Sequence, residues 1–293
     1  MKIGVLDIGS NSVRALVSAD GKLLFRGLIT TRLGEGLGTG NRLKEEAVAR
    51  TVTAVDELYK KCLSHGAERI CPFATEAVRS ADNGGDFVSA VKACCGLDVD
   101  VISGEEEAEI GLLGALEGKD GAIIDIGGGS TEISVAENKK LIYSKSLPLG
   151  AVRLFDACGE DRDKLEKIIS EKIKGFGKIP PVPCFTAIGG TATALAAVDL
   201  GLVKYDMSKI QGHYITKENL VKLNKKIFRS TVEERINELH ITPKRSEIIA
   251  GGAYLLLKLV CYLKTEGIKV SESDNMEGYI RKKILGESYE KQV

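Results

Sequence analysis

The residues best suited to chemistry in this chain lie in two short loops with closely related sequences. Each loop follows an apolar stretch that ends in an aspartate, Asp7 in one case and Asp125 in the other. Successive small residues let backbone N–H groups converge on an anion, and the aspartate can hold Mg²⁺ directly or through water. The pattern is typical of a phosphate site. Its candidate phosphate-binding residues are Ser10, Asn11, Ser12, Gly127, Gly128, Gly129 and Ser130.

A tight β-hairpin would explain one such loop equally well, but the loop occurs twice. Residues 5–27 and 123–145 align at an offset of 118, with seven of 23 positions identical. Each copy reads as three hairpin-linked strands. The duplication favours phosphate binding over a simple turn, and it predicts two copies of one structural unit.

Two further segments place small or polar residues after an expected strand. Gly190 and Thr191 begin a helix, and a helix N-terminus attracts anions. Taken alone, N-capping by Thr191 explains that segment better. Thr75 and Arg79 follow another strand and could present a hydroxyl and a guanidinium to an anion, although a surface helix turn explains them equally well.

Four carboxylates occur within five positions, at Glu105, Glu106, Glu107 and Glu109. Acidic residues suit the first turn of a helix, which explains part of the cluster. Four carboxylates this close also repel one another. Where one of them faces a phosphate cleft, repulsion and partial burial raise its pKa toward that of a useful general base.

The composition excludes several classes of function. The 293 residues correspond to about two domains, and 41 Lys and Arg balance 41 Asp and Glu. A net charge of zero and the absence of tryptophan argue against a nucleic-acid coat or an anionic-membrane binder, so we expect neither nucleic-acid nor membrane partners. The N-terminus lacks the pattern of a signal peptide, and we expect a cytoplasmic protein.

In the rest of each half, segments with the apolar spacing of a helix alternate with segments typical of a strand. This alternation indicates an α/β layer architecture. We expect domains at 1–118 and 119–293, with a final helix at about 276–290 that can pack back on the first domain. The expected helices are 44–63, 86–95, 105–116, 163–174, 191–199, 217–229, 246–266 and 276–285, and the further strands are 70–74, 99–102, 184–188 and 269–270.

Positive charge, cysteine and histidine are distributed unevenly. Residues 204–229 hold seven Lys or Arg and two Asp or Glu, which is most simply a solvated helix face that also places positive charge locally.

The seven cysteines form no C-x-x-C pair, and we expect reduced thiols, mostly buried. The three histidines lie on separate segments, which argues against a zinc hydrolase.

Seven motifs match those of one known family. They are DIGSNS (7–12), ATEAVR (74–79), ISGEEEA (102–108), IDIGGGSTE (124–132), SLPLGAVRL (146–154), GGTATALAA (189–197) and the GG–SES–EG tail (251–278). With these motifs the chain resembles the exopolyphosphatase / guanosine pentaphosphate phosphohydrolase family from residue 3 to about residue 285. The resemblance implies two duplicated ribonuclease-H-like domains of the actin-like ATPase, sugar kinase and heat-shock chaperone superfold, with an active cleft between the domains.

The resemblance also implies roles for individual residues. Glu107 matches the catalytic glutamate that activates the attacking water. Asp125 and Glu132 match acidic residues that hold a divalent ion, Mg²⁺ or Mn²⁺, and arrange the water. Asp7 is a further candidate ligand of that ion. Arg79 matches a phosphate-binding arginine, and the residues of the three glycine-rich loops match phosphate-binding positions.

The predicted activity is release of terminal orthophosphate from inorganic polyphosphate. Hydrolysis of guanosine pentaphosphate is an alternative that the motifs do not separate from it. An ATP-dependent small-molecule kinase and a non-catalytic nucleotide-binding protein are alternatives from other classes. Compared with the longer members that the resemblance brings to mind, we expect none of the helical domains that follow this core. The tail has no arginine before Glu277 and Gly278. Because two-domain members of the superfold commonly dimerise, we expect a homodimer.

Overall fold

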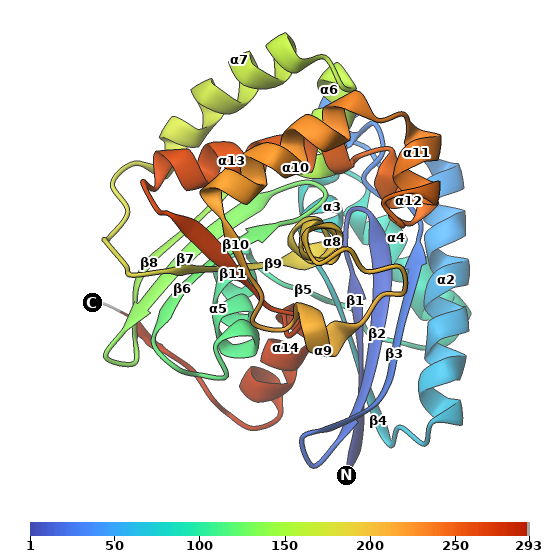
Figure 1. The fold of residues 1–293 in the computed structure, drawn as a ribbon. Helices are drawn as coiled ribbons and strands as arrows, with labels where there is room; N and C mark the ends of the chain where they lie inside the picture. The colour runs from blue at the N-terminus through green and yellow to red at the C-terminus, as the bar shows by residue number, and fades with distance from the viewer. Residues whose placement is uncertain (292–293) are drawn as a thin grey trace.

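The computed structural model describes residues 1–291, which form two mixed β-sheets with helices packed around them (Figure 1). Within these residues, the first sheet has five strands in the order β3-β2-β1-β4-β5. Its strands are β1 (Lys2–Ile8), β2 (Ser12–Ala19), β3 (Lys22–Thr30), β4 (Arg69–Ala74) and β5 (Asp100–Val101).

The second sheet has seven strands over the same described residues, in the order β10-β11-β9-β6-β7-β8-β12. Its strands are β6 (Gly121–Ile126), β7 (Thr131–Glu137), β8 (Lys140–Leu147), β9 (Phe185–Ile188), β10 (Tyr214–Thr216), β11 (Gly267–Val270) and β12 (Glu290–Lys291).

The two sheets repeat one topology, which confirms the predicted duplication. In the first, β1, β2 and β3 are antiparallel neighbours, and β4 and β5 continue the sheet in parallel from β1. In the second, β6, β7 and β8 take the antiparallel places, and β9 and β11 take the parallel ones. This shared order is the ribonuclease-H-like arrangement that the sequence motifs imply.

Helices cover both sheets and connect their strands (Figure 1). They are α1 (Leu37–Gly40), α2 (Glu45–Ser64), α3 (Glu76–Ser80), α4 (Gly84–Cys95), α5 (Gly104–Ala115), α6 (Ala151–Cys158), α7 (Arg162–Lys172), α8 (Gly189–Asp199), α9 (Met207–Ile210), α10 (Lys217–Arg229), α11 (Val232–Asn237), α12 (Pro243–Ser246), α13 (Ile249–Tyr262) and α14 (Asn275–Lys283), with a 3₁₀ turn at Ile173–Phe176.

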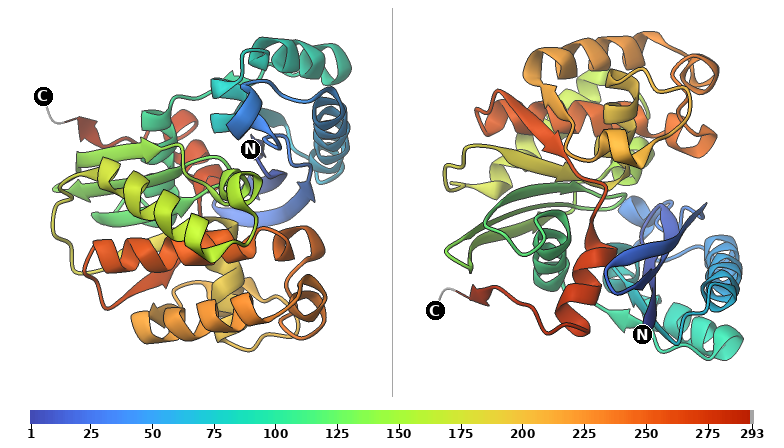
Figure 2. Two further views of the ribbon diagram at one scale, coloured as in Figure 1. Left: turned by 90° about the horizontal axis from the view of Figure 1, so that it is seen from above. Right: turned by 60° about the horizontal axis from the view of Figure 1, so that its bottom comes forward.

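Two helices lie between the sheets and tie them together. Helix α5 packs on β6, β7 and β8 of the second sheet, and α14 packs on α5 and on β1 of the first. Met276 and Tyr279 of α14 join a buried cluster with Val5 and Phe73 of the first sheet, where Phe73 and Tyr279 stack with 4.7 Å between ring centroids. Figure 2 shows α14, in red, beside the blue strands of the first sheet.

Most expected helices lie within a few residues of their predicted positions, and the helix expected over 246–266 is present but shorter than predicted. The chain forms the short α12, which has Pro243 in its first turn, and then begins α13 at Ile249. Helix α13 ends at Tyr262, because Lys264 adopts a left-handed conformation with φ of 55°. Helix α6 was not predicted. It has only eight residues, which are too few for the helical spacing of apolar residues to be recognised in the sequence.

No helix in residues 1–291 is both long enough and apolar enough to cross a membrane. The core instead comprises separate buried clusters. The largest lies under the helices of the second sheet, and another lies between the first sheet and helices α2 and α4. These clusters fix the two sheets as rigid supports for the loops that face each other between them.

Candidate active site

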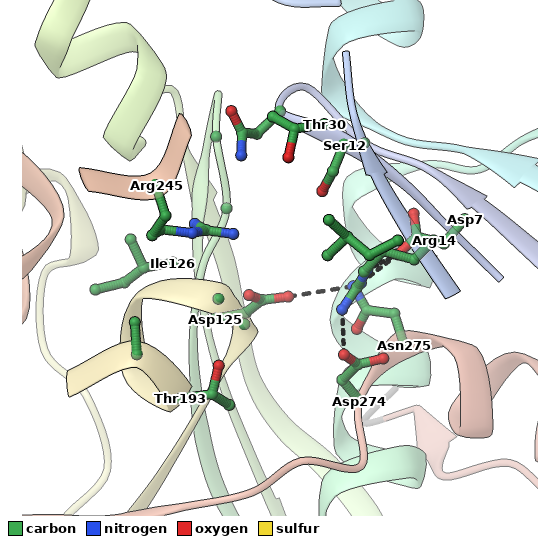
Figure 3. A pocket seen from close by; sticks show the side chains of 18 of the residues that line it. Asp7, Ser12, Arg14, Thr30, Asp125, Ile126, Thr193, Arg245, Asp274 and Asn275 are labelled. Carbon is green, nitrogen blue, oxygen red and sulfur yellow. Dashed lines mark hydrogen bonds and ion pairs between the residues drawn. The ribbon is translucent and has the colours of Figure 1, made fainter. Parts of the chain in front are cut away.

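A cavity of about 490 Å³ lies where the two sheets face each other, and both halves of the chain line it (Figure 3). Most of the site residues predicted from sequence line it. They are Asp7, Ser10, Asn11, Ser12, Thr75, Glu107, Asp125, Gly127, Gly128, Gly129, Ser130 and Gly190. The topology therefore brings together residues that are as much as 183 positions apart in the sequence, from Asp7 to Gly190.

The two predicted phosphate loops have the same internal geometry. In the first, the N–H of Gly9 donates to the carbonyl of Ser12 over 3.0 Å, and in the second the N–H of Gly127 donates to the carbonyl of Ser130 over 3.0 Å. Each loop is closed by one such bond, which turns the neighbouring N–H groups toward the cleft. The loops also touch, because a Cβ on Gly128 would lie 2.9 Å from that of Ser10.

Glycine at position 129 is required by this close approach. A side chain there would overlap the carboxylate of Glu76 and would lie 2.9 Å from the hydroxyl oxygen of Ser10. Glu76 is buried at the first turn of α3, and it was not predicted as a site residue. Its carboxylate therefore lies against the second phosphate loop.

Asp125 and Glu132 lie directly opposite each other on the paired strands β6 and β7. The same register in the first sheet places Asp7 opposite Arg14 on β1 and β2. At this cross-strand position the two copies of the unit carry opposite charges, a glutamate in the second copy and an arginine in the first. The alignment of the two copies already pairs Arg14 with Glu132. It did not show that Arg14 lies at the site.

Arg14 connects the first sheet to the start of α14. Its guanidinium forms ion pairs with Asp7 and with Asp274 (Figure 3). Asp274 caps α14 by accepting from the N–H of Met276 over 3.1 Å, and Glu277 accepts from the N–H of Asp274 over 3.1 Å. Aspartate followed three residues later by glutamate is a capping-box signal that could have marked this helix start from sequence.

Asn275, the next residue, holds the predicted metal ligand Asp125 in place. Its side-chain amide donates to Oδ2 of Asp125 over 3.2 Å, and the side chain is buried between the two sheets. Figure 3 shows this contact beside the Arg14 ion pairs. No residue-type pattern in the sequence indicated it, because the two residues are 150 positions apart.

Glu107 enters the cavity from the first turn of α5. Ser103 caps this helix by accepting from the N–H of Glu106 over 3.1 Å. Arg79 donates to Oε2 of Glu107 over 3.0 Å and to the carbonyl of Ile102 over 2.8 Å. Arg79 does not itself line the cavity. Its guanidinium lies behind Glu107, where it orients that carboxylate.

The three predicted catalytic carboxylates, Glu107, Asp125 and Glu132, are buried, and burial is the largest cause of a raised pKa in each. Burial and the neighbouring Glu132 raise the pKa of Glu107 well above its ordinary value. Burial and the charge of Asp125 raise the pKa of Glu132 to about 8. Burial raises the pKa of Asp125 to about 6, although Arg14 opposes the rise. Repulsion of this kind is relieved when a cation binds between carboxylates.

These donors fit a divalent metal ion. Carboxylate oxygens are the preferred ligands of Mg²⁺ and Mn²⁺. The Oδ1 atom of Asp7, which also lines the cavity, is buried without a hydrogen-bond partner in the described part of the chain. Glu132 does not line the open cavity and instead accepts a hydrogen bond from Ser146 over 2.6 Å, so Asp125 is the more accessible of the two predicted ligands.

The third predicted loop contributes less than expected. Gly190 lines the cavity, but Thr191 is fully buried and packs against Gly252 of α13. The guanidinium of Arg245 lies directly on Gly190, where any side chain would collide with it. Arg245 projects into the cavity from α12 (Figure 3).

Arg245 is the cation that sequence reasoning missed. Within residues 1–291 its guanidinium has neither a hydrogen-bond nor an ion-pair partner. Burial and the nearby Arg14 lower its pKa to about 10, which still leaves it charged at neutral pH. By contrast, the basic helix face at 217–229 is exposed and does not line the cavity, as its simpler interpretation predicted.

The chain matches the model of the Ppx/GppA phosphatase family over residues 13–287. It belongs to this family. Exopolyphosphatase 2 of Mycobacterium tuberculosis is 29% identical to it over 309 residues, which cover 94% of this chain and 97% of that protein. The crystal structure of the Aquifex aeolicus Ppx/GppA family member matches with a TM-score of 0.79 at 27% identity and covers 98% of both chains.

The fold agrees with other solved structures as well. An exopolyphosphatase from Cytophaga hutchinsonii matches with a TM-score of 0.87 and covers 99% of this chain and all of that one, at 22% identity. Membership of the Ppx/GppA family confirms the resemblance inferred from the motifs, and it makes the chain a phosphohydrolase.

Proposed function

We propose that this Ppx/GppA protein releases terminal orthophosphate from inorganic polyphosphate, with Glu107 as the base that accepts a proton from the attacking water. The observation that carries the proposal is the position of Glu107. Its buried carboxylate lines the cavity, is held by Arg79 at 3.0 Å, and has a pKa raised by burial and by Glu132. A base of raised pKa accepts a proton at neutral pH more readily than an ordinary carboxylate.

The predicted phosphate loops give the phosphoryl group its binding surface. The N–H groups of Gly128 and Gly129 have no partner in the described residues, and both glycines line the cavity. In phosphoryl transfer, charge spreads over the equatorial oxygens, and donors fixed in place before the reaction stabilise it. Arg245 adds a positive charge to this surface from the opposite wall.

We assign the metal ligands to Asp125 and Glu132, with Asp7 close enough to join them through water. A bound Mg²⁺ or Mn²⁺ would neutralise charge on the phosphoryl oxygens. Asn275 fixes the orientation of Asp125, and Ser146 fixes that of Glu132. The proton of the water passes to Glu107, and the shortened polyphosphate leaves as the anhydride bond breaks.

A second candidate substrate, guanosine pentaphosphate, is favoured by the apolar part of the same cavity. The cavity is also lined by apolar side chains, which suit a nucleoside better than a chain of phosphates. They include Leu28, Ala194, Ala197, Met207, Leu239, Ile241 and Met276. Tyr205 also lines it and donates a hydrogen bond to Glu272.

Phosphate release decides between these substrates. The purified chain is assayed with short polyphosphate, long polyphosphate, guanosine pentaphosphate and ATP, each with Mg²⁺, Mn²⁺ or a chelator. The proposal predicts metal-dependent release, with polyphosphate preferred. A preference for guanosine pentaphosphate supports the second candidate. Inactivity with every substrate and metal contradicts both, and phosphate transfer from ATP to a small molecule would indicate a kinase.

The predicted homodimer and cytoplasmic location are separate proposals. Light scattering after size-exclusion chromatography measures the mass in solution, and a value near the 31.4 kDa of one chain would contradict the dimer. Fractionation of the cells that produce the protein checks its location.

A further inference from the structure

A cluster of potential metal ligands lies on the outer face of the first half of the molecule, outside the active-site cavity. Helices α2 and α4 pack side by side there. Asp56 of α2 and the last two residues of α4, Cys94 and Cys95, each place one ligand atom within 4.8 Å of the others. None of the three lines the cavity. The cysteines were expected to be mostly buried, but Cys94 is exposed and Cys95 is half-buried.

The structure shows that this cluster already attracts positive charge. The ammonium group of Lys60, one turn after Asp56 on α2, lies 2.6 Å from Oδ2 of Asp56. The side-chain hydrogen bond to Asp56 raises the pKa of Lys60, and the nearby thiols add to that rise. The cluster also stands at the C-terminal end of α4, where unpaired carbonyl groups give the helix a partial negative charge. A cation is therefore stabilised at this point.

The types of ligand select the kind of cation. Two thiol sulfurs and one carboxylate suit Zn²⁺ and the softer Cd²⁺, whereas Mg²⁺ prefers oxygen ligands alone. Ligand atoms of one tetrahedral zinc ion lie roughly 3.4 to 3.8 Å apart, so the observed cluster needs only side-chain rotation to close around an ion. Three protein ligands leave a fourth position for water.

We propose that Asp56, Cys94 and Cys95 form a binding site for Zn²⁺ or another thiophilic divalent ion that links α2 to α4. Binding releases the two thiol protons to solvent, forms two metal–sulfur bonds and one metal–oxygen bond, and displaces Lys60 from Asp56. No oxidation or reduction is involved.

Cadmium titration under reducing conditions tests the site, because the ultraviolet charge-transfer absorption of a cadmium–thiolate bond does not arise from carboxylate sites. We expect one tight Cd²⁺ site per chain that excess Mg²⁺ does not displace. The double variant Cys94→Ser/Cys95→Ser should abolish the absorption, and Asp56→Asn should weaken affinity by at least roughly tenfold. Zn²⁺, measured by competition with a chromophoric chelator, should follow the same order.

Two further variants make the test specific. Cys261→Ser removes the other exposed cysteine, on α13, and should leave the site unchanged. Lys60→Met removes the competing ammonium and should tighten metal binding, which a merely exposed thiol pair would not show. Unchanged cadmium absorption in the double cysteine variant, or unchanged or weaker binding in Lys60→Met, overturns the proposal. Circular dichroism confirms that each variant is folded.

Discussion

The carboxylate of Glu76 and the guanidinium of Arg153 join the two halves of the molecule across the cleft, with 2.6 Å between Oε1 and Nη2. Glu76 begins α3 in the first half, and Arg153 lies on α6 in the second. Arg153 also donates to the carbonyl of Gly129 over 3.0 Å, and Ser10 donates to Glu76 over 3.4 Å. The ion pair therefore fixes both phosphate loops relative to each other.

The first prediction concerns the strength of this pair. Both side chains are shielded from solvent, at 9% exposure for Glu76 and 21% for Arg153. A double-mutant cycle of Glu76→Gln and Arg153→Met, measured by denaturant unfolding, should give a coupling free energy of roughly 0.5 to 3 kcal/mol. The surface pair Glu218–Lys222 of α10 is the matched control, and its coupling should be much smaller because both side chains are exposed. Equal couplings for the two pairs would contradict this account.

A second prediction isolates the proposed base. Glu107→Gln keeps the shape and the contact with Arg79 but cannot accept the proton, so phosphate release should fall by about 10²- to 10⁴-fold. Glu106→Gln is the control from the same helical turn, since Glu106 pairs with Lys283 at 2.8 Å instead of facing the cavity. It should remain near wild type. Turnover of polyphosphate by Glu107→Gln at the wild-type rate would remove Glu107 from this role.

The third prediction is a pH dependence of stability in the absence of metal. The pKa of Glu132 is about 8 in the folded chain and 4.5 in an ordinary glutamate, so between these values the folded protein keeps a proton that the unfolded chain releases. The stability from this group is complete below pH 4.5 and is lost as the pH rises to about 8, by up to about 1.4 kcal/mol per pH unit.

Glu132→Gln removes that titration. With a chelator present, its free energy of unfolding should exceed that of wild type by an amount that grows from pH 4.5 to 8 and then levels off. Mg²⁺ at pH 8 should stabilise the wild type more than the variant, because the cation neutralises the carboxylates it binds. Parallel stability curves for the two proteins over this pH range would show that Glu132 is not strained by burial.

The parts of the site that follow from local sequence were predictable. Each phosphate loop is a turn within one β-hairpin, so the repeated residue types reveal both its position and its geometry. The helix that carries Glu107 was predictable for a similar reason, because a serine caps its first turn, but the choice of Glu107 among four neighbouring glutamates came from the family resemblance. These features depend on neighbours only a few residues away.

The contacts that hold the two halves together were not predictable. Arg14 meets Asp274, and Asn275 meets Asp125, because α14 crosses back to the first sheet and brings residues more than 100 positions apart into contact. The sequence predicted that the final helix can pack back on the first domain, but it did not show which side chains that helix brings together. Packing between sheets decides which polar residues meet there, so those partners required the structure.

Arg245 provides the fourth prediction, and it tests which positive charges bind the substrate. The family resemblance assigned phosphate binding to Arg79, yet the structure places the unpaired Arg245 in the cavity and Arg229 on an exposed helix face. A hydrogen bond to a charged group contributes about 1.5 to 3 kcal/mol, so Arg245→Gln should raise KM for polyphosphate by roughly 10- to 100-fold.

Arg229→Gln removes the same formal charge and should leave KM nearly unchanged at moderate ionic strength, since solvent screens an exposed charge. The value of kcat should change little in Arg245→Gln if the guanidinium binds ground state and transition state equally, and it should fall if the guanidinium acts on the transferring group. An equal rise of KM in both variants would assign the effect to overall charge instead of to the cavity. A KM unaffected by Arg245→Gln would place the polyphosphate chain elsewhere in the cleft.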